Sequence, residues 1–477
     1  MVYEDIYFLS YEEAYYYAKQ QNKRDNGYLL QICYYDGEYK ESDFINLVHL
    51  PIDKLSEILA FGTYRFPTKI SFAGTSFSDE IKELITNNFD ENLRTTQVLR
   101  NKCNNYYFNM ALTQKPNFNE PLRFFLQANV NTQVMQYISK NIADTLKEKG
   151  FDVLLRYIYG IEDMHSLKEY VEFNPHVTIN INHLNNDYIN SEVFNFVWFQ
   201  DYMPFLKDEA IVQNRKRDYF FSYQSIFTNE LERKGIDKSK IFKQEIIPVD
   251  EKEFYDKKLK RSKKIVFVGS FYQKERVSSY MTSKIDTLLD QILEKGESLT
   301  FDNLKTLFDK SDIPIEEENG YFNEIQQGYI RNKCVEWLCN QKDIEIYGYE
   351  WDKSKIKNIQ NYFQGSIDKS ELNNLYNTTE YVLAASGQVL NTQRLGELVH
   401  AGAIPVVYDS RDISDEKEKW DEECLYFKTK EDLEYILNNN IKPKKYKSEK
   451  MLNYFTYQTF LEKIFNTINN EVESDKK

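Results

Sequence analysis

The chain has 477 residues, more than one hydrophobic core normally organises, so we expect two or three domains. Its net charge of −14 argues against nucleic-acid binding, because neutralising phosphates requires a basic surface. No run of sequence reaches the roughly 20 apolar residues that a transmembrane helix needs.

The first 117 residues predict a small α+β region of their own, to which the sequence assigns no role. Helix-like "YEEAYYYAKQQ" and "IDKLSEILAF" alternate there with strand-like "YLLQICYY" and "TKISFAG". The acidic start "MVYEDIYFLSYEEA" lacks the basic and then apolar order of a signal peptide, and the five cysteines of the chain are too scattered for a disulfide framework. We therefore expect a cytoplasmic protein.

Residues 118–250 predict a doubly wound α/β domain. The segment "RFFLQ" predicts a buried strand, and the following helix places Val134, Ile138, Ile142 and Leu146 on one face. Further strands are expected at "FDVLLRYIY", "PHVTININH", "VFNFVWFQD" and "DYFFSYQ". Strands that are apolar throughout, and not in alternation, are typical of a parallel sheet covered on both faces.

The same pattern restarts after a charged segment and predicts a second domain over residues 265–445. Its strands are expected at "KIVFVGS", "IEIYGY", "YVLAAS" and "AIPVVYD", with a helical insertion over 275–340 between the first two. Residues 446–477 predict a C-terminal helix and tail. The expected fold class is therefore α/β, with two tandem Rossmann-like domains beside the N-terminal α+β region.

Two parallel sheets are suited to holding two reactants, because open sheets bind ligands at the carboxyl ends of their strands. A dehydrogenase would need G-x-G-x-x-G after a first strand, and neither "LQANVNTQ" nor "VGSFYQKE" contains it. A Walker P-loop is also absent from the sequence. These patterns leave group transfer and a non-catalytic scaffold both open.

Five residues after the first two strands of the second domain are candidates for contacts to a nucleotide. Gly269 and Ser270 end the strand "IVFVGS", where a glycine allows a phosphate to approach the backbone and Lys274 adds positive charge. Tyr347 and Trp351 follow the second strand and offer rings for stacking on a nucleobase. The alternative for the first group is a plain strand-to-helix turn, and for the second group core aromatics.

The stretch "NTQRLGELVHAG" is a more specific candidate site. Asn391 is expected to be the N-cap of a helix, with Thr392 in its first turn. A helix N-terminus attracts anions, and Arg394 strengthens that attraction for a pyrophosphate. Glu397 shares a face with Arg394 and is suited to accept hydrogen bonds from ribose hydroxyls. The alternative for Glu397 is a surface ion pair with Arg394.

These segments resemble GT-B glycosyltransferases, in which "IVFVGS", "IEIYGYEW", "FQGSIDKSELNNLYNTTEYVLAAS" and "NTQRLGELVHAGAIPVVYD" have counterparts in the same order. The group-1, CgeB-type branch is the most similar, over about residues 265–435. The resemblance implies hexosyl or related transfer from a nucleotide sugar, UDP- or GDP-linked, to a protein or glycan acceptor. It implies that the C-terminal domain holds the donor. Val389 replaces the first glutamate of the retaining families' E-x7-E motif, so retention or inversion stays open.

The first domain is expected to meet the acceptor and to supply a catalytic base. Asp201 and His183 end the strands "WFQD" and "NINH" and are the candidate bases. Asn129, Asn131 and Thr132 occupy the first strand-to-helix loop and are candidates for contacts to sugar or acceptor. The structural alternatives are a turn residue for Asp201 and a backbone-bonded histidine for His183.

The sequence predicts a reaction without a metal ion, because it contains no D-x-D motif. Stabilising the leaving group then falls to Arg394, the lysines and the helix end. The expected protein is a metal-independent glycosyltransferase. The alternative is a non-catalytic GT-B-like protein that binds a partner.

Overall fold

The structure is a computed structural model of the chain. It describes residues 6–8, 10–21, 32–34, 47–49, 51, 69–72, 77–129, 133–158, 164–184, 187–200, 215–222, 225–243, 248–272, 279–309, 328–387, 389–414, 416 and 418–475. Contacts divide the chain into two units, one of Met1–Phe221 with Ile236–Lys240 and one of Ser222–Gly235 with Ile241–Lys477. None of the described helices combines the length and the apolar character needed to span a bilayer.

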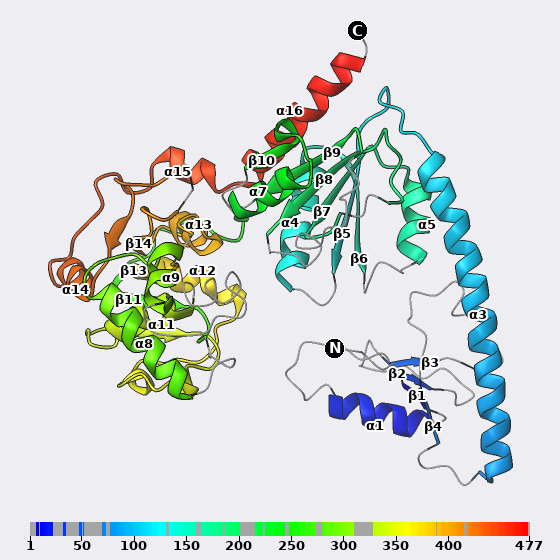
Figure 1. The fold of residues 1–477 in the computed structure, drawn as a ribbon, viewed down its shortest axis with the longest axis horizontal. Helices are drawn as coiled ribbons and strands as arrows, with labels where there is room; N and C mark the ends of the chain where they lie inside the picture. The colour runs from blue at the N-terminus through cyan, green and yellow to red at the C-terminus, as the bar shows by residue number, and fades with distance from the viewer. Residues whose placement is uncertain are drawn as a thin grey trace. The chain divides into compact units, whose positions relative to one another are not determined.

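The first unit begins with a small parallel sheet in the order β3-β2-β1-β4 (Figure 1). Its strands are β1 (Ile6–Phe8), β2 (Ile32–Tyr34), β3 (Leu47–His49) and β4 (Lys69–Ser71), with α1 (Tyr11–Gln21) after the first. The described part is thus α/β and not the α+β layout that the sequence suggested. The sequence between successive strands is long, as a parallel sheet requires, because a tight hairpin turn joins only antiparallel strands. The 35-residue helix α3 (Asp79–Thr113) follows.

Five strands of the first unit then lie in the order β9-β8-β7-β5-β6 (Figure 1). They are β5 (Arg123–Asn129), β6 (Asp152–Ile158), β7 (Val177–Ile181), β8 (Phe194–Phe199) and β9 (Asp218–Ser222), with helices α4 (Gln133–Glu148) and α5 (Met164–Phe173) between them. The pairs β5–β6, β5–β7 and β7–β8 are parallel. Every residue of β7 and β8 is buried, which confirms the prediction from their apolar runs.

Helix α4 buries the face that its periodicity predicts, with one exception. Ile138, Ile142 and Leu146 are fully buried, whereas Val134 is 53% exposed. Val134 lies in the first turn of the helix. The four-residue spacing is therefore correct for the three later positions only.

The second unit contains a five-stranded sheet in the order β12-β11-β13-β14-β15, and all of its pairs are parallel. The strands are β11 (Ser262–Val268), β12 (Ile344–Tyr347), β13 (Thr379–Ala384), β14 (Ile404–Tyr408) and β15 (Leu425–Phe427). The helices are α7 (Ser225–Arg233), α8 (Ser279–Leu293), α9 (Phe301–Asp309), α11 (Ile330–Leu338), α12 (Lys369–Thr378), α13 (Gln393–His400), α14 (Lys430–Asn438), α15 (Glu449–Tyr454) and α16 (Tyr457–Asp475). A short strand, β10 (Ile241–Lys243), precedes the sheet in the chain.

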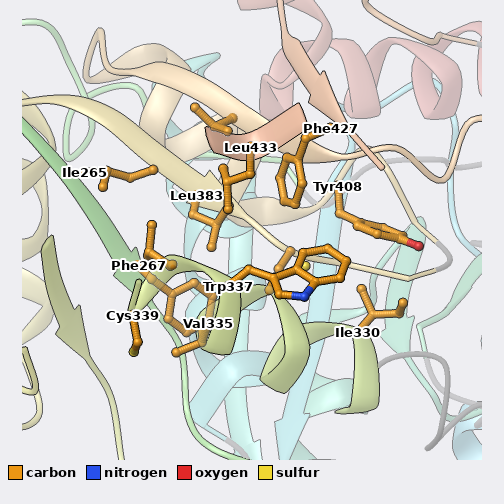
Figure 2. Packing of buried hydrophobic residues seen from close by; sticks show 14 of the residues in the cluster. Ile265, Phe267, Ile330, Val335, Trp337, Cys339, Leu383, Tyr408, Phe427 and Leu433 are labelled. Carbon is orange, nitrogen blue, oxygen red and sulfur yellow. The ribbon is translucent and has the colours of Figure 1, made fainter. Parts of the chain in front are cut away.

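Alternate residues of these strands face two separate hydrophobic cores. Phe267 and Leu383 pack with side chains of α8, α9, α11 and α14, and Figure 2 shows them near Trp337 and Leu433. Val266 and Val382 pack on the other face with residues of α12, α13 and α15. A sheet covered on both faces explains why its strands are apolar throughout. The expected α/β class with two Rossmann-like parts is confirmed.

Candidate functional site

The strand order of the second unit locates a ligand-binding edge. Relative to β11, β12 lies on one side and β13 on the other, so the winding of the chain reverses at β11. Open α/β sheets bind ligands at the carboxyl ends of the strands beside such a reversal. Gly269 and Ser270 follow β11 directly, and Tyr347 is the last residue of β12. The predicted contacts at these strand ends therefore fall on the expected edge.

The loops after β11 and β12 are held together by direct backbone contact. The Gly269 amide donates to the Tyr347 carbonyl at 2.9 Å. Gly348 has a φ of 143°, and a Cβ atom there would lie 2.1 Å from the Gly269 oxygen. Only glycine can therefore occupy position 348 without moving the loop after β11.

Trp351 supports this contact from inside the protein. It is fully buried, and its indole Nε1 donates to the Gly269 oxygen at 2.6 Å. Its ring packs against Phe267 and Phe271, with centroid distances of 5.8 and 5.3 Å. In this structure Trp351 holds the loop and offers no face for stacking. Tyr347 is half-buried, and its hydroxyl donates to Glu345 at 3.1 Å.

Helix α13 starts one residue later than the sequence suggested. Thr392 is the N-cap, and its hydroxyl accepts from the Leu395 amide at 3.2 Å. Asn391 is not the cap, because its buried side chain donates to the Glu418 carbonyl at 3.1 Å and accepts from Trp420 at 2.5 Å. The expected N-cap is thus wrong, and Asn391 ties the start of α13 to a loop that follows β14.

That loop also carries Glu416, which the sequence analysis missed. Glu416 is 4% exposed, and its carboxylate accepts from the amides of Leu390 and Asn391 at 2.5 and 2.8 Å. The hydroxyl of Ser414 donates to the same carboxylate at 2.5 Å. Glu416 therefore positions the backbone that leads into α13. Its place in the acidic run "DSRDISDEKEKW" carries no local signal for this role.

Arg394 and Glu397 share one face of α13, as predicted. The guanidinium NH1 of Arg394 donates to the hydroxyl of Tyr376 and lies 4.0 Å from the Glu397 carboxylate. Among the described residues, no carboxylate lies closer to Arg394. Gln393 donates to Glu397 at 2.9 Å, and the Glu397 side chain is only 7% exposed. Burial raises the pKa of Glu397, and the charges of Arg394 and Lys369 oppose that rise.

A second arginine, Arg331 of α11, approaches the same edge. Its Cζ lies 4.4 Å from the ring centroid of Tyr272, and the neighbouring Asn332 donates to the Tyr272 carbonyl at 2.9 Å. Burial lowers the pKa of Arg331; the nearby Tyr272 raises it and the charge of Arg394 lowers it further. The two guanidinium groups are therefore close enough to repel each other. No carboxylate in the described part of the chain lies within 4.0 Å of Arg331.

This arrangement leaves a surplus of positive charge beside the start of α13. Arg331 has no carboxylate within 4.0 Å in the described part of the chain, and Arg394 has one, Glu397, at 4.0 Å, so the two guanidinium groups favour an added anion. The unpaired amides at the start of a helix favour the same kind of ligand. Sequence reasoning missed Arg331 because the segment "YIRNKC" lies in the helical insertion and has no motif around it.

The predicted acceptor-side residues belong to the first unit. Asn129 ends β5 and His183 follows β7, and the register of Gln127 with Asn180 places both at one edge of the sheet. Burial lowers the pKa of His183, so its imidazole is neutral at pH 7. The side chain of Asn129 is not described. Asn131, Thr132, Asp201 and Lys274 lie outside the described residues.

No cluster of three His, Cys, Asp or Glu side chains suited to a metal ion occurs within the ranges that the structure describes. Comparison with curated proteins gives no match.

Three solved structures show remote likeness. Sucrose-phosphate synthase from Thermosynechococcus elongatus is 10% identical, with a TM-score of 0.42 over 74% of this chain and 100% of that one. The apo form of the lipopolysaccharide outer core galactosyltransferase WaaB is 12% identical, with a TM-score of 0.40 over 72% and 99%. TarM is 11% identical, with a TM-score of 0.34 over 61% and 54%. At TM-scores below 0.5 these likenesses carry no inference.

A family model matches part of the second unit, and Gly269, Ser270 and Tyr272 precede the matched segment. The matched segment includes Arg331, Arg394 and Glu397. Residues 331–465 match the model of the family described as glycosyl transferase-like.

Proposed function

We propose that the protein is a GT-B glycosyltransferase of the CgeB-like branch that transfers a hexosyl or related group from a UDP- or GDP-linked sugar to a protein or glycan. One observation carries the proposal. The segment that matches the glycosyl transferase-like model also holds two guanidinium groups, Arg331 and Arg394, near the starts of α11 and α13 at the carboxyl edge of a parallel sheet. A nucleoside diphosphate is the anion that such an edge suits best.

In this proposal the diphosphate lies between the two arginines and the start of α13. Arg394 is directed by Tyr376, and the amides after Thr392 point toward the same anion. Gly269 and Ser270 offer backbone at the end of β11, and Lys274 adds charge. Positive groups fixed in place before the reaction stabilise the charge that develops on the leaving diphosphate, and no metal ion is then required.

Glu397 would accept hydrogen bonds from the ribose hydroxyls. Its carboxylate is nearly enclosed, and among the described residues only Gln393 is a close donor, with Arg394 at 4.0 Å. A buried carboxylate gains most from additional donors, because each hydrogen bond offsets its loss of hydration. Tyr347, at the end of β12, would line the nucleoside.

The acceptor side would use His183 or Asp201 as the base, with Asn129, Asn131 and Thr132 near the sugar or acceptor. A neutral imidazole supports the assignment to His183, because a base must be able to take a proton. The acceptor oxygen would form a bond to the anomeric carbon and give its proton to the base. The bond to the diphosphate would break, and its electron pair would leave with the diphosphate.

The test is donor binding followed by turnover. Thermal unfolding is measured with UDP, GDP, CDP and CMP sugars, and a true donor at one hundred times its Kd should stabilise the protein by about 2.7 kcal/mol. Arg394→Ala and Glu397→Ala should abolish transfer and leave the fold intact, while Lys450→Gln, an exposed residue, serves as the control. EDTA should leave the rate unchanged.

The outcomes separate the possibilities. Full transfer by Arg394→Ala would overturn the donor site, and loss of activity with EDTA would overturn the metal-independent route. Donor binding without transfer or hydrolysis would support the non-catalytic alternative.

A further inference from the structure

A second polar pocket lies at the opposite edge of the five-stranded sheet. Arg261 precedes β11, Glu380 lies near the start of β13, and Lys442 and Lys447 come from the segment after α14. The pocket has a volume of about 540 Å³. It therefore lies at the amino ends of the parallel strands, away from the edge that carries Gly269 and Gly348.

The charges in this pocket do not balance. Four cationic side chains line it, and only two carboxylates, Asp256 and Glu380, accompany them. Asp256 is shared by Lys258 at 2.9 Å, Arg261 at 3.4 Å and Lys447. Among the described residues, Glu380 pairs with Lys442. Two positive charges remain in excess, in a protein whose net charge is −14.

The excess charge is partly shielded from water. The side chains of Asp256, Arg261 and Lys447 are 15%, 19% and 19% exposed. The pKa of Lys447 is lowered by burial, and Lys258 and Arg261 lower it further although Asp256 opposes them. Burial is the largest cause of this fall, and repulsion by the two neighbouring cations adds to it. An added anion would relieve that repulsion.

Gly402, which has no side chain, leaves room for Lys447 and Arg261 beside it. A Cβ atom at Gly402 would lie 2.3 Å from the Lys447 Nζ and 2.7 Å from the Arg261 NH2. Arg261 itself is committed, since it donates to the carbonyls of Tyr376 at 2.5 Å and Ala401 at 2.7 Å. Each lysine makes one carboxylate contact and has three N–H donors, so the ammonium groups are the ones that can also contact a ligand. Tyr446 forms part of the wall beside them.

We propose that this pocket binds a small phosphorylated molecule, whose phosphate contacts Lys447 and Lys258 and whose polar body fills the remaining volume. A phosphate carries close to the two negative charges that the pocket lacks. A volume of this size is typical of small-molecule sites and suits a sugar phosphate or a mononucleotide. The site is independent of the proposed donor site, because no lining residue is shared.

The test is isothermal titration of the full chain with a hexose 6-phosphate and with ribose 5-phosphate, neither of which carries the nucleobase and diphosphate of the proposed donor. Lys447→Met and Lys258→Met remove one ammonium each. Lys258 is 81% exposed, so its replacement leaves the fold undisturbed even if Lys447→Met does not. Arg394→Met reports on the donor site, and Lys450→Gln controls for loss of a surface charge.

We expect at least one of the two ligands to bind the wild type. Its Kd should rise at least fivefold in Lys258→Met and in any folded Lys447→Met protein, and should stay unchanged in Arg394→Met and Lys450→Gln. Absence of binding by both ligands would overturn the proposal. An unchanged Kd in Lys258→Met, or binding that is lost in Arg394→Met, would overturn it as well, since the ligand would then occupy another site.

Discussion

The hydroxyl of Tyr376 in α12 accepts a hydrogen bond from the guanidinium of Arg394 in α13. Tyr376 is fully buried, while the Arg394 side chain is 31% exposed. The bond therefore joins a buried ring to a charged group near the start of α13 that is still partly exposed. It sets the direction of Arg394 before any donor binds.

Tyr376→Phe should weaken nucleoside diphosphate binding about tenfold, because Arg394 loses the partner that directs it. The free energy of unfolding should fall by about 1 kcal/mol. Titration with UDP and GDP and urea unfolding measure the two effects. Tyr381→Phe is the matched control, since its buried hydroxyl donates to the Ile441 carbonyl at 3.1 Å. Equal loss of affinity in both variants would contradict the role of Tyr376.

Arg331→Met should weaken binding of a nucleoside diphosphate by roughly 10- to 100-fold, which corresponds to one lost charge-assisted contact. The unliganded protein should not lose stability, because the repulsion between Arg331 and Arg394 disappears. The exposed Arg233 gives the control Arg233→Met, with unchanged affinity expected. If Arg331→Met is less stable but binds the nucleoside diphosphate normally, Arg331 has a structural role and does not contact the donor.

Gly348→Ala should destabilise the protein by about 3 kcal/mol or more, since its Cβ would meet the Gly269 oxygen at 2.1 Å and its φ is 143°. Gly365→Ala is the matched control. It has a φ of 88° and open space around the new atom, so only the cost of the left-handed backbone, about 1 to 2 kcal/mol, is expected. Urea unfolding of both variants checks the difference, and equal values would refute the close contact.

Glu416→Gln should lower the free energy of unfolding by about 1 to 3 kcal/mol, because one amide oxygen replaces a carboxylate that accepts from two backbone amides. Donor affinity should fall with it, although Glu416 touches no donor atom in our proposal. Glu418→Gln loses only a surface pair with Lys450 and should change neither quantity. Normal donor affinity in Glu416→Gln would show that the loop does not position α13.

His183 should make the protein sensitive to acid. Its pKa is lowered by burial in the folded chain and is about 6.5 when unfolded, so protons bind the unfolded chain more readily. Stability from this group is therefore complete above pH 6.5 and is lost as the pH falls toward the folded pKa. The difference in unfolding free energy between pH 8 and pH 5.5, about 2.5 units apart, should be smaller in His183→Gln than in the wild type. An identical difference would contradict this assignment.

His183 should also determine how the transfer rate depends on pH. If His183 is the base, kcat/KM should be level above pH 6.5 and fall only as the pH drops through the folded pKa, which burial places below 6.5, because a protonated imidazole accepts no proton. His183→Gln should lose most activity while it retains donor affinity.

Much of the architecture follows from local pattern. The apolar runs of β7, β8 and β11 to β14 predicted parallel strands covered on both faces, and alternate residues such as Val266 and Phe267 do face two cores. The three-residue spacing of Arg394 and Glu397 likewise placed them on one helical face. These features depend on the backbone period of a strand or a helix, which a short stretch of residues sets by itself.

The composition of the candidate sites was decided only by the tertiary structure. Asn391 has the side chain of an N-cap, but Trp420 and Glu418 engage it from a distant loop, and Thr392 caps α13 instead. Arg331 reaches the neighbourhood of Arg394 from an insertion, and Lys258 and Lys447 meet at Asp256 from opposite ends of the second unit's sequence. Contacts of this kind depend on strand order and on packing between remote segments, and no local period in the sequence encodes them.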